Sequence, residues 1–498
     1  MKIQLEQLDL LHPWPRLALR DGYHAVRVLV RIGNAPVGEV TARPVRRQRE
    51  LSHRRLRRRI ARSLATPILT HCLRLGMAAG PGALQWLVTG AWGRFALAGG
   101  SPGEARRFVE ESVLLPTGLP APVRDWASDG DRPQRAPLPP ITVAVCTRDR
   151  EDVLEACLIR LRELDYPSFE VLVVDHSRDP VPTRDIADRC GARYVRCGVG
   201  GLSRARNAAL ANATHEWVAF TEDDCRPEKA WLRELATATR DPRCRAASGL
   251  VLPARLDSAA EVADAMRRAA GRTYEPAVFD RRTLRARRSR AAVASAWGAA
   301  PGAGLLVHVA AALKIGGFDI DLGPGPHSVG GRGQDHDLLY RLLRARHHVH
   351  YVPSAVVQQS LCASPKALRK QVRDDAAGMA AYHARCALLR ADYRSLLHLA
   401  CGLPIGFARD LLLGMTGRTK YPFTLVLPAI RGTLEGPLAY AGGKVGRLWQ
   451  EWRHPEPPGS WKRDRRAVTP SPATAPQAEP GPWTPRPQKV LYRSARAA

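Results

Sequence analysis

The segment Trp217–Pro227 (WVAFTEDDCRP) ends a short apolar run in three consecutive carboxylates, Glu222, Asp223 and Asp224. An apolar run this short, bounded by charge and then by Pro227, predicts a buried strand that ends in a loop. Neighbouring carboxylates raise one another's pKa unless a cation lies among them. Their oxygens suit Mg²⁺ or Mn²⁺, which in turn hold phosphate groups. The segment therefore fits a metal site, and a solvated acidic turn is the alternative.

Two earlier apolar runs, Ile141–Cys146 and Phe169–Val174, also end in polar residues. Segments with helical spacing follow each run, and strands that alternate with helices predict a parallel sheet covered on both faces. In such sheets ligands bind beyond the carboxyl ends of the strands. The polar residues that we expect to meet the acidic segment there are Thr147, Arg148, Asp149 and Asp175.

Two further segments carry charged residues at the start of predicted helices. Gly201–Ala208 (GLSRARNA) places Arg206 in the first turns of a helix, and Gly330–Leu343 (GGRGQDHDLLYRLL) runs from a glycine-rich loop into a helix that begins near Asp335. Asp335 could act in chemistry, or it could be an acid that the helix dipole stabilises. Asp337 is expected to cap the same helix.

Together these segments resemble the family 2 glycosyltransferases of the GT-A fold, over roughly residues 140–360. The resemblance rests on the TRDR loop, the VVD strand end, the ARN segment, the acidic segment followed by CRPEKAWL, the IGGFD segment at Ile315–Asp319, and GRGQDHDLLYRL. It implies an α/β domain with a Rossmann-like, mostly parallel sheet. It also implies inverting transfer of a sugar from a UDP- or dTDP-linked donor to a hydroxyl of an acceptor. The basic, partly amphipathic flanking regions favour a glycan or lipid-linked acceptor of the cell envelope.

The same resemblance assigns roles to individual residues. Glu222 and Asp224 would hold Mg²⁺ or Mn²⁺, which neutralises the leaving diphosphate. Asp335 would be the catalytic base that takes the proton from the acceptor hydroxyl. The residues that would bind the nucleotide sugar are Thr147, Arg148, Asp149, Asp175, Arg206 and Asp223.

Some positions depart from the family pattern. Gln334 precedes the expected base where the family often has Glu, and Gln359 lies in the following strand where the family often has a metal-binding His. The QxxRW segment of processive synthases does not follow Asp335, which favours a non-processive enzyme. The two glutamines also support an alternative function, a catalytically weak or inactive relative that binds nucleotide sugars or acts as a scaffold.

Composition limits the partners and the location. The chain has 498 residues and a formal net charge of +29, which favours anionic partners such as phosphorylated substrates or an anionic membrane surface. Nucleic acid is disfavoured because aromatic residues do not interleave with the basic runs and no recognised binding motif follows. Scattered cysteines indicate a reducing compartment, and uninterrupted apolar stretches stay below the ~18 residues of a spanning helix. We expect a cytoplasmic protein, peripheral on the inner face of the plasma membrane.

Two flanking regions bear on membrane contact. In the basic run Pro44–Ser63, Leu56 and Ile60 continue to Leu64 as a thin apolar stripe, which could contact anionic lipid or pack on its own domain. Farther on, apolar pieces around Leu396–Leu413 and in 423–430 predict either core helices or a surface-lying hairpin. The expected organisation is an N-terminal α+β region with a basic helix (1–136), ending in a Pro-rich linker, a GT-A domain (137–360), a helical region (361–455) and a disordered tail (456–498).

Overall fold

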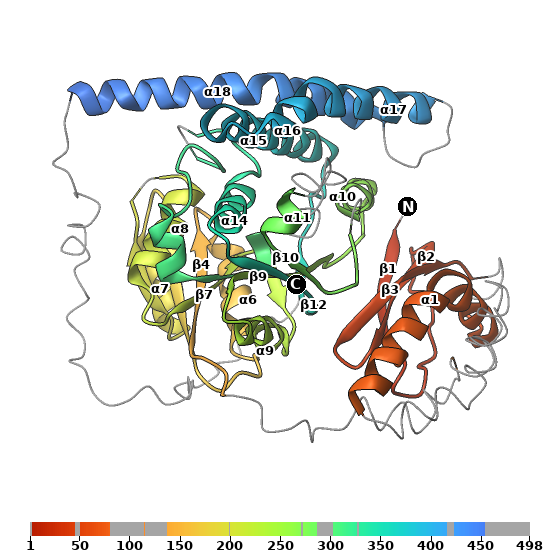
Figure 1. The fold of residues 1–498 in the computed structure, drawn as a ribbon. Coiled ribbons are helices and arrows are strands. Elements are labelled where there is room, and N and C mark those ends of the chain that lie inside the picture. The colour runs from red at the N-terminus through yellow and green to blue at the C-terminus, as the bar shows by residue number, and fades with distance from the viewer. Residues whose placement is uncertain are drawn as a thin grey trace, which may run out of the picture.

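The computed structural model describes residues 2–44, 50–79, 114, 137–198, 200–269, 272–285, 302–325, 328–415 and 423–453. These residues form a small N-terminal sheet with one long helix, a larger α/β domain, and a layer of long helices beside that domain (Figure 1). Most of the expected linker and the whole expected tail (456–498) lie outside the described residues.

The α/β domain is built on a mixed sheet with strand order β10-β12-β9-β11-β7-β4-β5-β6, and β8 pairs with β12. Strands β4, β5, β6 and β7 are parallel, and β11 is antiparallel to both β7 and β9. Because β12 is parallel to β9, six strands point the same way. The expected α/β class with a mostly parallel sheet is confirmed. The strands are β4 (Ile141–Thr147), β5 (Phe169–Asp175), β6 (Arg193–Arg196), β7 (Trp217–Glu222), β8 (Cys225–Pro227), β9 (Cys244–Pro253), β10 (Ala277–Phe279), β11 (Leu305–His308) and β12 (His348–Gln359).

Helices cover both faces of this sheet, which explains why its strands are apolar without alternation. Successive residues of β4 point to opposite faces: Val143 and Val145 join one core, whereas Ala144 and Cys146 join the other. The first core includes α6 (Glu151–Leu161), α7 (Val181–Arg189) and α9 (Trp231–Ala236), and the second includes α8 (Leu202–Asn212), α13 (Val309–Lys314) and α14 (Gln334–Arg344). Two shorter helices, α10 (Ala259–Ala269) and α11 (Arg281–Arg285), complete the domain.

The N-terminal part is a sheet of order β1-β2-β3 with α1 packed on it. Strands β2 (Ala25–Ile32) and β3 (Ala35–Ala42) pair as an antiparallel hairpin, and β1 (Ile3–Asp9) lies parallel to β2. Helix α1 (His53–Ala79) begins later than the basic run suggested. Its apolar stripe, Leu56, Ile60 and Leu64, is buried in the core of this part. The packing alternative is therefore correct, and the prediction that this stripe contacts lipid is wrong.

This N-terminal sheet is attached to the α/β domain near β9 and β12. The Arg31 guanidinium lies 2.6 Å from Oε2 of Glu228, and the backbone N–H of Ile3 donates to the Leu256 carbonyl at 2.9 Å. Leu29 packs in a small apolar cluster with residues of β9 and β12.

The helical layer consists of α15 (Pro365–Arg390), α16 (Tyr393–Leu397), the π-helical turn η4 (His398–Gly402), α17 (Leu403–Met415) and α18 (Val426–Arg453). Helix α18 lies along α15 on the side away from the sheet (Figure 1). The contact is close because α18 presents Gly432 and Gly436, where an added Cβ would overlap the carbonyls of Arg373 and Ala377. Small residues four apart allow two helix backbones to approach in this way.

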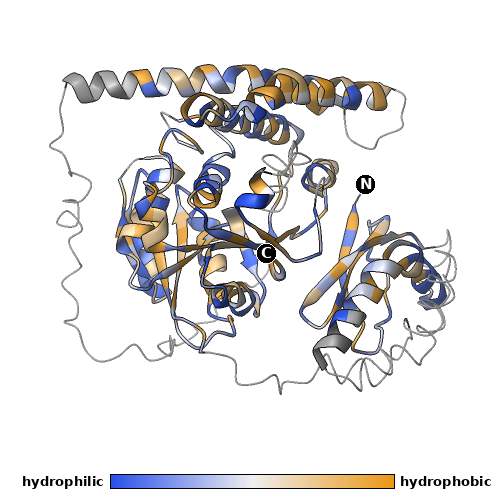
Figure 2. Ribbon diagram, in the orientation of Figure 1, coloured by the Kyte–Doolittle hydropathy of each residue, from blue (hydrophilic) through white to orange (hydrophobic). Residues whose placement is uncertain are grey.

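The outer side of this layer is apolar and exposed (Figure 2). The run Tyr393–Met415 is long and apolar enough to cross a membrane by length and composition, and none of its most apolar window is buried. The core-helix alternative for 396–413 is therefore wrong. On α18, Leu427, Leu434 and Leu438 are 73, 68 and 75% exposed. Their spacing places them on one face, opposite the two glycines.

The glycine contact between α15 and α18 yields a stability prediction. We expect Gly436→Ala to lower the free energy of unfolding by about 1–3 kcal/mol, because the new Cβ must push the helices apart. The matched control is Gly442→Ala in the same helix, where nothing lies within 4 Å of the added Cβ. There the better helix propensity of alanine is expected to leave stability unchanged or raise it by up to about 1 kcal/mol. Chemical denaturation measures both, and equal effects would contradict the close contact.

Candidate active site

The loops that follow β4, β5 and β7 meet at the carboxyl edge of the sheet, as the sequence predicted. Thr147 is the register partner of Asp175, and its Oγ1 donates to Oδ2 of Asp223 at 2.8 Å. The backbone N–H of Asp149 donates to Oγ of Ser177 at 2.8 Å, which ties the first loop to the second. The polar residues of three separate strand ends thus form one site.

The acidic segment turns from β7 into the short strand β8. Glu222 is the last residue of β7, and its carboxylate, that of Asp224 and the Cys225 thiol offer atoms that all lie within 4.8 Å of one another. Burial and the neighbouring Glu222 and Asp224 carboxylates raise the pKa of the Cys225 thiol well above its usual value, and sulfur is a soft ligand that hard ions such as Mg²⁺ and Mn²⁺ do not favour. The two carboxylates predicted to hold a metal ion are therefore the usable pair.

Arg150 supplies positive charge to the acidic segment, and the sequence did not predict this role. Its Nη1 lies 2.7 Å from Oδ1 of Asp223, and its Nη2 lies 3.3 Å from Oδ2 of Asp224. Burial raises the pKa of Asp223 to about 6, while Arg150 and a hydrogen bond from Thr147 oppose the rise. The second Arg of the TRDR loop was the available signal, but sequence alone does not show that its side chain reaches the acidic segment.

Gln359 also contacts the acidic pair, but through its amide nitrogen. Nε2 donates to Oε2 of Glu222 at 2.5 Å and to Oδ1 of Asp224 at 3.3 Å, whereas Oε1 accepts from Nη1 of Arg268 at 3.0 Å. A metal ligand at this position would direct a lone pair at the acidic pair, whereas Gln359 directs its amide N–H at them. Burial and the nearby Asp224 raise the pKa of Glu222 to about 7, so the segment holds protons more readily than free acids do.

Arg206 joins Asp335 to the acidic segment from a buried position. Its guanidinium is 2% exposed, donates through Nη1 to Oδ1 of Asp335 and lies 3.7 Å from Oε1 of Glu222. It also lies over the rings of Phe220 and Phe318, at 5.8 and 5.5 Å from their centroids. Burial raises the pKa of Asp335, and the ion pair with Arg206 opposes that rise. The predicted base and the predicted metal ligands are thus linked through one arginine.

Asp175 is fully buried and already engaged by protein donors. Oδ1 accepts from the backbone N–H of Ser177 at 2.7 Å, and Oδ2 accepts from the Tyr194 hydroxyl at 2.7 Å and from Nη1 of Arg196 at 3.0 Å. A carboxylate has about four acceptor positions. Three of them are filled by protein donors, and the side chain has no exposed surface, so a ligand N–H would reach it only if a protein donor moved aside.

Arg148 and Asp149 lie at the partly exposed rim of the site. Nε of Arg148 is 3.6 Å from Oδ2 of Asp149, and Oδ1 of Asp149 accepts from the backbone N–H of Arg178 at 2.8 Å. Asp149 adopts a left-handed backbone conformation, with φ of 50°. This conformation turns the chain back toward the loop after β5.

Asp337 does not cap α14, contrary to the sequence prediction. The N-cap residue is Gly333, and the fully buried Asp337 instead pairs with Arg341 and with Arg385 of α15. Arg385 also lies 2.5 Å from Asp319. The residue is therefore a structural link between α14, which carries Asp335, and the helical layer.

Comparison with known proteins is consistent with this geometry. Residues 142–287 match the family model described as Glycosyl transferase family 2. Two curated relatives, pre-mycofactocin glycosyltransferases of two Mycobacterium tuberculosis strains, are 29% identical over 277 residues, 53% of this chain and 54% of theirs. The chain thus spans about half the length of the curated relatives it matches.

Solved structures show weaker similarity. A mannosyltransferase from Pyrobaculum calidifontis, solved with GDP-Man and Mn²⁺, is 20% identical, covers 64% of this chain and 92% of its own, and has a TM-score of 0.39. Glucosyl-3-phosphoglycerate synthase from Mycobacterium tuberculosis, solved with Mn²⁺ and UDP, is 16% identical, covers 47% and 78%, and has a TM-score of 0.32.

The family match and the sheet topology agree with the fold class that the sequence motifs implied. The α/β domain has the mostly parallel sheet of the GT-A class, and its residues 142–287 match the family model described as Glycosyl transferase family 2.

Proposed function

We propose that the chain transfers a sugar from a nucleotide-sugar donor to a hydroxyl of an acceptor, with inversion at the anomeric carbon. The observation that carries this proposal is the linkage of Asp335 through Arg206 to Glu222 of the acidic segment. This linkage supports Asp335 as the proton acceptor on one side of the anomeric carbon. It also supports the acidic segment as the binding place for the leaving diphosphate on the other side.

The donor would bind across the edge formed by the three loops. Thr147, Arg148, Asp149 and Asp175 would contact the nucleoside, with UDP or dTDP as the favoured nucleotide. The carboxylate of Asp175 suits an imide N–H of a pyrimidine base once a protein donor such as Tyr194 or Arg196 moves aside, and a base without that N–H would not replace the lost hydrogen bond.

The diphosphate of the donor would bind near Asp223, Asp224 and Glu222. The oxygen-rich pair Glu222 and Asp224 fits a hard cation such as Mg²⁺ or Mn²⁺, which would neutralise charge on the leaving diphosphate. Arg150 and Gln359 already compensate these carboxylates. We infer that Arg150 then turns toward the phosphates, where a guanidinium forms strong charge-assisted hydrogen bonds.

Asp335 would take the proton from the acceptor hydroxyl as that oxygen attacks the anomeric carbon. A base must be ionised to do so, and the ion pair with Arg206 favours the ionised form. A single displacement with departure of the nucleoside diphosphate inverts the anomeric configuration, and it needs one base and no covalent intermediate.

The helical layer supports a glycan or lipid-linked acceptor at an anionic membrane, on the inner face of the plasma membrane. Helices α16, α17 and α18 all carry exposed large apolar side chains, and the chain carries a net charge of +29. Helix α15 beneath it touches the loop before α14, because Gly378 on α15 packs against the carbonyl of Arg332. An acceptor held at the membrane would thus approach the side of the site that carries Asp335.

A second candidate function is a nucleotide-sugar-binding relative with weak or no catalysis. Two observations favour it: Gln359 gives a donor rather than a lone pair to the acidic pair, and Oε1 of Gln334 is buried without a hydrogen-bond partner among the described residues. Donor binding without turnover would distinguish this candidate from the first.

Activity measurements test the two candidates. Full-length protein is incubated with a panel of nucleotide sugars, glycan and lipid-linked acceptors, and Mn²⁺ or Mg²⁺, and the released nucleoside diphosphate is quantified. We expect Asp335→Asn and Asp224→Asn each to lower the rate by about 10²–10⁴-fold, because one removes the base and the other a metal ligand. The control is Asp188→Asn, whose side chain on α7 is 65% exposed. Full activity in both site variants would contradict the mechanism, and donor binding without turnover in the wild type would support the second candidate.

The raised pKa values of Glu222 and Asp223, about 7 and about 6, predict a pH-dependent response to metal. Without metal, these groups bind protons more tightly in the folded than in the unfolded chain. The stability they contribute is present below their ordinary pKa values and is lost as pH rises through 6 and 7. A bound cation compensates the ionised carboxylates instead. The rise in melting temperature caused by Mn²⁺ with UDP should therefore be larger above pH 7 than below pH 6.

Differential scanning fluorimetry across this pH range measures the effect. Glu222→Gln, which cannot titrate at that position, should flatten the upper part of the profile. An identical profile in the wild type and this variant would show that Glu222 is not involved.

The membrane proposal predicts flotation with anionic liposomes. Wild-type protein should float with phosphatidylglycerol-containing vesicles, and the double variant Ile405→Glu/Leu438→Glu should lose most of this binding, because charge on an inserted face opposes burial in lipid. Both side chains are exposed, at 68 and 75%, so the fold should be preserved. The matched control is Ile159→Glu on α6, 48% exposed and outside the helical layer. Wild-type protein that stays at the bottom of the gradient would refute the proposal.

A further inference from the structure

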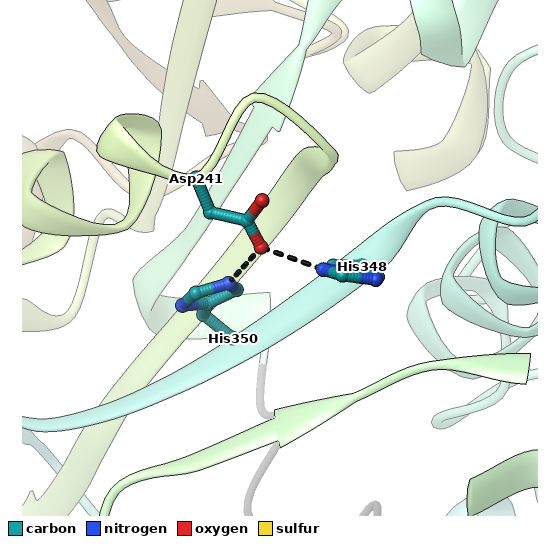
Figure 3. Close-up of side chains that lie close together, drawn as sticks. All are labelled: Asp241, His348 and His350. Carbon is teal, nitrogen blue, oxygen red and sulfur yellow. Dashed lines mark hydrogen bonds and ion pairs between the residues drawn. The ribbon is translucent and has the colours of Figure 1, made fainter. Parts of the chain in front are cut away.

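A second cluster of potential ligands lies at the opposite end of β12 from the active site. His348 and His350 near the start of the strand both face Asp241, which precedes β9 (Figure 3). Nδ1 of His348 lies 2.6 Å and Nε2 of His350 lies 2.9 Å from the same oxygen, Oδ2 of Asp241. The three groups offer one atom each, and these atoms all lie within 4.8 Å of one another.

The backbone holds all three side chains in this arrangement. His348 and His350 are two residues apart on one strand and therefore point to the same face. Oδ1 of Asp241 accepts from the backbone N–H of Arg243 at 2.9 Å, which leaves Oδ2 directed at the histidines. The backbone N–H of His348 donates to the carbonyl of Arg243 at 2.9 Å, so the turn and the strand are joined directly.

The cluster is accessible to a small ion. The side chains of Asp241, His348 and His350 are 23, 21 and 18% exposed. His350 also lines a cavity of about 530 Å³ between the N-terminal part and strands β10 and β12. An ion could therefore enter without unfolding the sheet.

The donor atoms select a different class of cation from the active site. Two imidazole nitrogens and one carboxylate oxygen suit Zn²⁺ and similar borderline ions, whereas the oxygen-only pair Glu222 and Asp224 suits Mg²⁺ or Mn²⁺. Zinc sites with three protein ligands take water or another donor in the fourth position. We propose that Asp241, His348 and His350 form a second metal site that binds Zn²⁺ or a similar transition-metal ion, separate from the donor site.

Such a site would fasten the turn before β9 to the start of β12. The two strands are parallel neighbours, and β12 ends at Gln359, which contacts the acidic pair. At ~3.3 Å per residue, His348 lies ~36 Å along the strand from Gln359. The proposed role of the metal site is therefore structural and does not depend on the transfer reaction. Binding to the folded state alone would raise the melting temperature by mass action.

Zinc titration of full-length, tag-free protein tests the proposal. The background is Asp224→Asn, which weakens the donor site so that it does not compete for Zn²⁺. After chelator treatment, isothermal calorimetry with Zn²⁺ alone should show one saturable site per chain. The visible spectrum after addition of Co²⁺ alone should show nitrogen-containing coordination, and Mg²⁺ should displace neither ion.

Ligand variants in the same background locate the site. Adding His348→Gln or His350→Gln should weaken Zn²⁺ binding by at least about tenfold and abolish the Zn²⁺-dependent rise in melting temperature. His347→Gln, adjacent to the cluster but outside it, should leave both unchanged. Circular dichroism without metal confirms that each variant is folded. Unchanged Zn²⁺ binding in both ligand variants, or no saturable binding in the background protein, would overturn the proposal and leave Asp241 as a hydrogen-bonding partner of the two histidines.

Discussion

Four carboxylates lie together at one edge of the sheet, and the site depends on how their mutual repulsion is compensated. Two unit charges 4 Å apart interact by about 4 kcal/mol at the effective dielectric near a protein surface, and burial adds a desolvation cost. Arg150 meets Asp223 and Asp224, and Arg206 lies between Asp335 and Glu222. The residual imbalance appears as raised pKa values, which a cation or a proton can relieve.

The compensating groups differ in how easily they can move. Arg206 is buried over the rings of Phe220 and Phe318 and donates to Asp335, so it holds Asp335 beside the acidic segment. Arg150 is 45% exposed and can reorient when a charged ligand enters. Oε1 of Gln359 accepts from Arg268, and its Nε2 donates to the carboxylates of Glu222 and Asp224. The acids are therefore compensated by the buried Arg206, by the half-exposed Arg150 and by the neutral amide of Gln359.

Local patterns predicted the α/β class and the meeting of the strand-end loops, because apolar runs and parallel topology determine both. They did not predict which basic side chain compensates which acid. The contacts of Arg150 and Gln359 with Asp224 join residues 74 and 135 positions apart, and only packing brings them together. The basic helix shows the same limit: its stripe at Leu56 and Ile60 fits lipid or a sheet equally well by periodicity, and β1, which helps form that sheet, was not predicted.

Helix α15 lies between α14, which carries Asp335, and the exposed apolar helix α18, and it contacts both closely. Gly378 admits the loop before α14 to direct backbone contact, while Arg385 pairs with Asp337, two residues beyond the predicted base Asp335. On its other side α15 receives Gly432 and Gly436 of α18, which leaves the leucines of α18 facing outward. The outer layer and the helix that carries Asp335 are thus joined through close backbone contacts and one buried ion pair. If a membrane binds that layer, as we propose, the position of Asp335 relative to the membrane is set by helix α15.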